Sequence, residues 1–100
     1  MMPLTRSGRE GDSIYVDEDV RQRWDGLCRD APETMAACFD ALTEAPYPDE
    51  WLGLQHGPIK DARKTLGPER AWEWRVSDVE RVIYRRGPDG PVIVHVGPPV

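Results

Sequence analysis

The sequence predicts an α+β fold: a short N-terminal strand, then a helical hairpin, then a three-stranded antiparallel meander packed on the helices. Two patterns carry this prediction. Residues 18–44 contain two stretches whose apolar side chains recur at helical spacing, and residues 71–96 contain three β-prone stretches joined by short turns. Short connections make neighbouring strands antiparallel, and the apolar face of such a sheet needs helices to cover it.

The N-terminal region divides into two parts. Residues 1–12 mix glycine, serine, arginine and acids without hydrophobic periodicity, which predicts a flexible arm. We expect residues 13–100 to form a single domain, since a chain of this length supports one hydrophobic core. Within that domain the apolar triplet 14–16 favours a short strand, and Asp17 suits the N-cap of a following helix.

Two amphipathic stretches predict the helical hairpin. The first helix should end before Pro32, and Pro46 and Pro48 should stop the second, because proline cannot continue a helix. The apolar stripes recur at i, i+3 or i+4, and i+7, with Val20, Trp24 and Leu27 in the first and Met35, Cys38, Phe39 and Leu42 in the second.

The segment after the hairpin has no clear periodicity. We expect an ordered loop over residues 44–58, in which the apolar Trp51, Leu52 and Leu54 cover one end of the core. Residues 59–70 fit either a helical turn or an irregular arm, and the pattern does not choose between them.

The last third of the chain predicts the meander. Apolar and charged residues alternate at its start, so Trp72, Trp74 and Val76 share one face, which should be buried. Strands are expected at residues 71–76, 80–85 and 92–96, with a turn at Gly87-Pro88-Asp89-Gly90.

Composition excludes several classes of protein. The sequence has no run of about 18 apolar residues that could cross a bilayer, and its N-terminus lacks the apolar core of a signal peptide. We therefore expect a cytoplasmic protein with no membrane partner and no disulfide framework. A zinc site from Cys28, Cys38, His56 and His95 would need ligand spacings that no pair shows, so no metal and no other cofactor is expected.

The charge is divided unevenly along the chain. Residues 1–50 carry five arginines against twelve acids, whereas residues 51–100 carry eight lysines and arginines against six acids. The net charge of −5 argues against non-specific nucleic-acid binding, which depends on neutralising phosphates. A local basic face in the second half remains compatible with this composition.

Three stretches of the expected meander resemble the core of the RelE/ParE family of bacterial toxins. They are Trp-x-Trp-Arg-Val at 72–76, Asp-x-x-Arg-Val-Ile-Tyr-Arg at 78–85 and Val-Ile-Val-His-Val-Gly at 92–97. The family also begins with a short strand and a helical hairpin, so the resemblance covers residues 13–97 in layout and 71–97 in residue detail. It implies a toxin of a type II toxin–antitoxin system, with a cognate antitoxin as its partner.

The resemblance also implies site residues. RelE-type toxins cut messenger RNA on the ribosome by attack of a ribose 2′-hydroxyl, which needs a base, an acid and positive charge beside the phosphate. Arg81 matches the arginine that these enzymes place at the scissile phosphate, Arg75 matches a second basic residue, and His95 is a candidate base. Residues expected to bind RNA or a partner are Lys60, Arg63, Lys64 and Arg85, with Arg70 beside them. The cluster of Lys60, Arg63, Lys64 and Arg70 fits a solvated arm equally well.

The sequence departs from the family in two places, and these departures leave three functions open. Glu73 stands where the ribosome-cleaving enzymes often have lysine, and Pro98-Pro99-Val100 replaces their basic pair and tyrosine. One function is a ribosome-dependent mRNA endonuclease that inhibits translation. A second is a non-enzymatic inhibitor that binds DNA gyrase or another protein, as ParE-type toxins do. A third is an inactive, toxin-like interaction module. The oligomeric state is not predicted.

Overall fold

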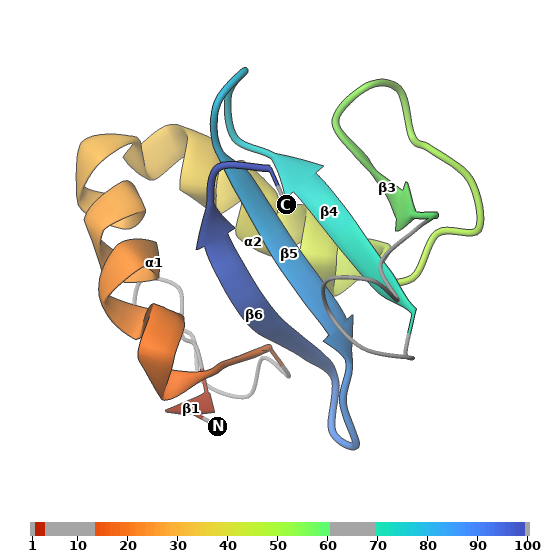
Figure 1. Ribbon diagram of the computed structural model, residues 1–100, viewed down its shortest axis with the longest axis horizontal. Helices are drawn as coiled ribbons and strands as arrows, with labels where there is room; N and C mark the ends of the chain where they lie inside the picture. The colour runs from red at the N-terminus through yellow and green to blue at the C-terminus, as the bar shows by residue number, and fades with distance from the viewer. Residues whose placement is uncertain (1, 4–13, 61–69, 100) are drawn as a thin grey trace.

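The computed structural model describes residues 2–3, 14–60 and 70–99, which form two layers. Two helices lie together on one face of a single sheet (Figure 1). The elements are β1 (Met2–Pro3), β2 (Tyr15–Val16), α1 (Glu18–Asp30), α2 (Pro32–Glu44), β3 (His56–Ile59), β4 (Ala71–Arg75), β5 (Arg81–Arg86) and β6 (Pro91–Gly97). The predicted α+β class is confirmed.

The sheet is larger than the predicted meander. β4, β5 and β6 are consecutive antiparallel neighbours, as expected, but the strand order is β1-β2-β6-β5-β4-β3. β2 runs parallel to β6, so the sheet is mixed. In the described part of the chain, neither helix is long and apolar enough to cross a membrane.

Two strands were not predicted. β3 covers the last three residues of the expected loop and the first residue of the segment left open, and it pairs antiparallel with β4, while β1 pairs with β2. β3 spans only four residues and contains Gly57 and Pro58, which weaken a strand, so its sequence carries no strand signal. Apart from β1, the predicted N-terminal arm lies outside the described residues, as do residues 61–69 of the segment left open above.

The helical hairpin begins and ends close to the predicted positions. Asp17 occupies the N-cap of α1, but it acts through its backbone and its side chain makes no capping hydrogen bond. Its N–H donates to the carbonyl of Ile93 in β6 (3.1 Å), and its carbonyl accepts from Val20 in α1 (3.0 Å). One residue therefore fixes the helical hairpin to the middle of the sheet.

The core lies between the helices and the sheet, and the predicted tryptophan face is buried in it. Cys38 is fully buried, which raises the pKa of its thiol well above the ordinary value and leaves it unreactive. The core residues are Ile14, Val16, Trp24, Met35, Cys38, Phe39, Leu42, Trp72, Trp74, Val82, Tyr84, Ile93 and Val96. Leu52 and Leu54, expected to cover this core, are instead exposed, because they lie in the turn that leads into β3.

Hydrogen bonds from the core hold the loop between α2 and β3. The Tyr84 hydroxyl donates to the carbonyl of Pro46, and the Trp72 indole N–H donates to that of Pro48 (2.9 Å). His56 Nε2 lies 2.5 Å from the Tyr84 oxygen. Since the only hydroxyl hydrogen of Tyr84 goes to Pro46, His56 must donate and carries its proton on Nε2.

We expect Gly57→Ala to destabilise the protein by about 1–3 kcal/mol, because there is no room for a methyl group. A Cβ at this position would lie 2.3 Å from the Trp51 ring. Gly26→Ala on α1 is the matched control, since its Cβ would meet nothing closer than 3.8 Å. That change should stabilise the protein by about 0.5–1 kcal/mol. Urea unfolding of both variants measures the difference, and equal effects would contradict the tight packing of Trp51.

We expect the free energy of unfolding to fall as the pH drops below about 6.5, the ordinary pKa of histidine. Burial lowers the pKa of His56 in the folded protein. Below about pH 6.5 the unfolded chain therefore binds a proton at this histidine more readily than the folded protein does. The contribution of His56 to the free energy of unfolding is therefore fully present above about pH 6.5, and it decreases as the pH falls toward the pKa of His56 in the folded protein. Urea unfolding from about pH 5.5 to 7.5 tests this sign, and His56→Gln should flatten the profile relative to the parent. A parent and variant with the same slope would show that His56 is not the group responsible.

Candidate functional site

The face of the sheet away from the helices carries the charged residues that the resemblance singled out. Alternation along β4 and β5 places Glu73, Arg75, Arg81 and Arg85 on this face. The register sets Arg75 opposite Arg81, and it sets Ile83, the neighbour of Glu73, opposite His95 on β6. The three predicted catalytic residues thus share one end of one face.

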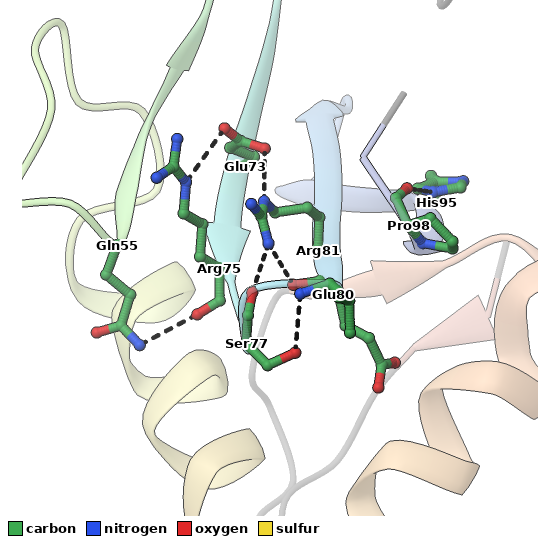
Figure 2. A network of polar contacts seen from close by, with 9 residues as sticks. Gln55, Glu73, Arg75, Ser77, Glu80, Arg81, His95 and Pro98 are labelled. Atoms are coloured by element: carbon green, nitrogen blue, oxygen red, sulfur yellow. Dashed lines mark hydrogen bonds and ion pairs between the residues drawn. The ribbon is translucent and has the colours of Figure 1, made fainter.

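Glu73 lies between the two arginines (Figure 2). One carboxylate oxygen is 3.7 Å from Nε of Arg75, and the other is 3.6 Å from Nε of Arg81. The side chains of Glu73 and Arg81 are only 15% and 11% exposed, so this ion pair is shielded from water, whereas Arg75 is 42% exposed. The internal carboxylate neutralises half of the positive charge that the two arginines bring.

Arg81 is committed to the turn that joins β4 to β5. Its Nη1 donates to the carbonyl oxygens of Ser77 (2.5 Å) and Glu80 (3.1 Å). The backbone N–H of Val76 closes the same turn by donating to Glu80 (3.0 Å). An Arg81 side chain that turned to hold a phosphate would leave the Ser77 carbonyl without its donor and would leave Glu73 paired with Arg75 alone.

Arg75 is tied to the loop before β3. Its guanidinium carbon lies 4.8 Å above the centre of the Trp51 ring, a cation–π contact. Its backbone N–H donates to the carbonyl of Gln55 (2.7 Å), and its carbonyl accepts from the Gln55 side chain (3.2 Å; Figure 2). Trp51 rests on Gly57, which explains why β3 needs glycine there.

His95 lies to one side of the arginines, near the C-terminal end of β6 (Figure 2). Its Nε2 is 2.8 Å from the carbonyl of Pro98, so Nε2 carries a proton and Nδ1 is the basic nitrogen. Arg23 of α1 reaches the same strand end and donates from Nη1 to the carbonyl of Val96 (3.2 Å). A base and an additional cation therefore stand beside Gly97.

Sequence reasoning missed Arg23 and Gln55. Arg23 contacts a carbonyl 73 positions away in the sequence, and Gln55 depends on a strand that has no sequence signal. Trp51 was expected to cover the core, but its ring lies against Gly57 and Arg75. Nothing in the local pattern separates Arg23 from the other arginines of α1. A glycine flanking an apolar aromatic segment, here Gly57 after Trp51, was the one available hint of close packing.

The residues predicted to bind RNA or a partner are only partly described. Lys60 is exposed directly after β3, and Arg85 is half-buried on the outer face of β5. Arg63 and Lys64 lie outside the described residues. No group of three or more His, Cys, Asp or Glu residues within residues 14–60 and 70–99 could hold a metal ion.

This arrangement is better suited to contact than to catalysis. Cleavage of RNA needs an unoccupied arginine beside the phosphate and a paired base and acid. Here Arg81 is occupied, and the hydrogen bond of His95 goes to Pro98 and not to the Glu73–Arg75–Arg81 cluster. Arg75 and Trp51 present the charge and the ring that remain accessible in part.

No protein-family model and no curated protein matches this sequence.

We expect Arg81→Ala to lower the free energy of unfolding by about 1–3 kcal/mol, because the Ser77 carbonyl loses its donor and the shielded Glu73 carboxylate keeps only the more exposed Arg75. Arg75→Ala is the matched change on the opposing strand, and it should cost no more than about 1 kcal/mol because Arg75 is more exposed. Chemical denaturation of both variants distinguishes the two roles. An Arg81 variant as stable as the parent would show that this side chain is free to serve a ligand.

Proposed function

We propose that this protein is a toxin of a type II toxin–antitoxin pair that arrests growth by binding a protein target without cutting RNA. DNA gyrase is the target that the resemblance to ParE-type toxins suggests.

The layout supports the toxin half of the proposal. A short strand, a helical hairpin and an antiparallel meander occur in this order over residues 15–97, as the RelE/ParE resemblance implies, although the unpredicted strand β3 comes between the hairpin and the meander. The most specific matching stretch, Arg81-Val82-Ile83-Tyr84, is the middle strand of the meander, and its apolar members are buried. Fold alone does not fix function, so the mode of action has to come from the site.

The contacts of Arg81 support a toxin that acts without cutting RNA. Its guanidinium already contacts one carboxylate and two backbone carbonyls, and its side chain is 11% exposed. Glu73 would also repel a phosphate that approached the pair of arginines. A protein partner is not excluded in this way, because Trp51, Arg75 and the exposed Leu54 offer stacking, charge and apolar surface at the same end of the sheet.

Ribosome-dependent cleavage of messenger RNA is the second candidate, and one observation favours it. Arg23 and His95 meet at the end of β6, where Arg81 stands opposite Gly97. A cation and a histidine with a basic nitrogen are part of what such cleavage needs.

We expect induced expression in a bacterium that lacks the antitoxin gene to arrest growth while ribosome-bound messenger RNA stays intact. Colony counts measure the arrest, and primer extension on a reporter message measures cleavage. Arg75→Ala should restore growth at least tenfold in colony count, because it removes the accessible cation of the site while stability changes little. Arg29→Ala on the exposed side of α1 is the control and should remain toxic.

The alternative outcomes separate the functions. Message cut at mapped ribosomal positions would replace the proposal with the second candidate. Normal growth at a verified level of folded protein would contradict any toxin function and favour an inactive interaction module.

A further inference from the structure

Three cations lie at one end of three neighbouring strands, the end of the sheet opposite to Arg75. The pairing of β3 with β4 ends at Ile59 and Ala71, so Lys60 directly follows the paired part of β3 and Arg70 directly precedes that of β4. Arg86 is the last residue of β5 and follows Arg85, which pairs with Ala71. We call Lys60, Arg70 and Arg86 the basic row; β3, β4 and β5 lie side by side in Figure 1.

The basic row is exposed, and carboxylates of the described residues neutralise little of its charge. All three cations are exposed. Arg70 lies 3.9 Å from Asp49, but their side chains are 64% and 92% exposed, so this ion pair contributes little. Among the described residues, Lys60 and Arg86 have no carboxylate within ion-pair distance.

Aromatic rings hold the two arginines of the row in place. The guanidinium of Arg70 lies 5.2 Å from the centre of the Trp72 ring, and that of Arg86 lies 4.3 Å from the centre of the Tyr47 ring. The two rings are themselves packed together, with centroids 4.9 Å apart. Guanidinium groups fixed over rings keep the N–H donors at their edges available and lose less conformational entropy when they bind an anion.

We propose that the basic row is a docking site for an acidic α-helix of a partner protein. Adjacent strands are about 4.8 Å apart, and side chains at i and i+4 of a helix are about 5–6 Å apart, so successive carboxylates can meet successive cations. Same-face residues of an extended peptide are about 6.8 Å apart and fall out of step with the strands. The planar forks of the arginines match carboxylates in bidentate fashion.

Two observations favour a carboxylate-bearing partner over a nucleic acid. The chain has a net charge of −5, which opposes an extended polyanion. No open ring stands ready for base stacking at the row, because Trp72 is buried and Tyr47 already contacts Trp72 and Arg86. The inference does not depend on the proposed toxin function, since the row and the Arg75 site lie at opposite ends of β4.

The test is fluorescence anisotropy of the purified full chain with a labelled, alanine-rich helical peptide that carries glutamate at positions i, i+4 and i+7. A peptide with glutamine at the same positions should bind at least tenfold more weakly. Arg70→Gln and Arg86→Gln should each weaken binding of the glutamate peptide roughly tenfold, the effect of losing a charge-assisted hydrogen bond. Arg86→Lys, which keeps the charge and loses the fork, should weaken it less.

Arg29→Gln on α1 is the matched control, because it removes one exposed positive charge elsewhere and should leave the affinity unchanged. Equal binding of the two peptides, or an equal effect of Arg29→Gln and Arg86→Gln, would overturn the proposal. So would tighter binding of an eight-nucleotide single-stranded RNA that depends on Arg70 and Arg86, or concentration-dependent self-association abolished by Arg86→Gln. Circular dichroism verifies that every variant is folded.

Discussion

The hydrogen bonds that Trp72 and Tyr84 donate to Pro48 and Pro46 fix the loop between α2 and β3 to the sheet. Both donors are buried, so leaving them unpaired would cost free energy that the fold avoids by bringing the loop to them. The loop leads into β3, which pairs with the edge of β4. Trp51 and Gln55, at the end of the loop, contact Arg75. The Trp72 indole nitrogen and the Tyr84 hydroxyl, on the inner face, thus help to position the loop residues that contact Arg75 on the outer face.

On the same outer face, the carboxylate of Glu73 changes what the two arginines can bind. Two arginines on opposed strands repel each other unless a counter-ion stands between them, and Glu73 supplies that counter-ion from within the chain. The ion pairs with Glu73 therefore occupy the positive charges of Arg75 and Arg81 that an anionic substrate would need. This is the physical reason for favouring a contact function over RNA cleavage at this end of the sheet.

Much of the fold follows from periodicity. Apolar stripes over thirteen-residue helices and the alternation around Trp72 and Trp74 specify long elements with one buried face. β1 and β3 are too short for any period to be visible, and β3 is held by tertiary contacts that only the folded chain supplies. For the site, alternation places Arg75 and Arg81 on one face, but it cannot show that Arg81 bends back to its own turn or that Arg23 arrives from α1.

β3 also governs what can join the sheet. Gln55 bonds to Arg75, so the next residue, His56, and Pro58 two positions on direct their backbone groups outward. The outward carbonyl of His56 already accepts from Leu52 (2.7 Å), and Pro58 has no N–H to offer. An additional strand could therefore form few backbone hydrogen bonds with β3, which disfavours edge-to-edge self-assembly. A partner at this edge would have to bind mainly through side chains.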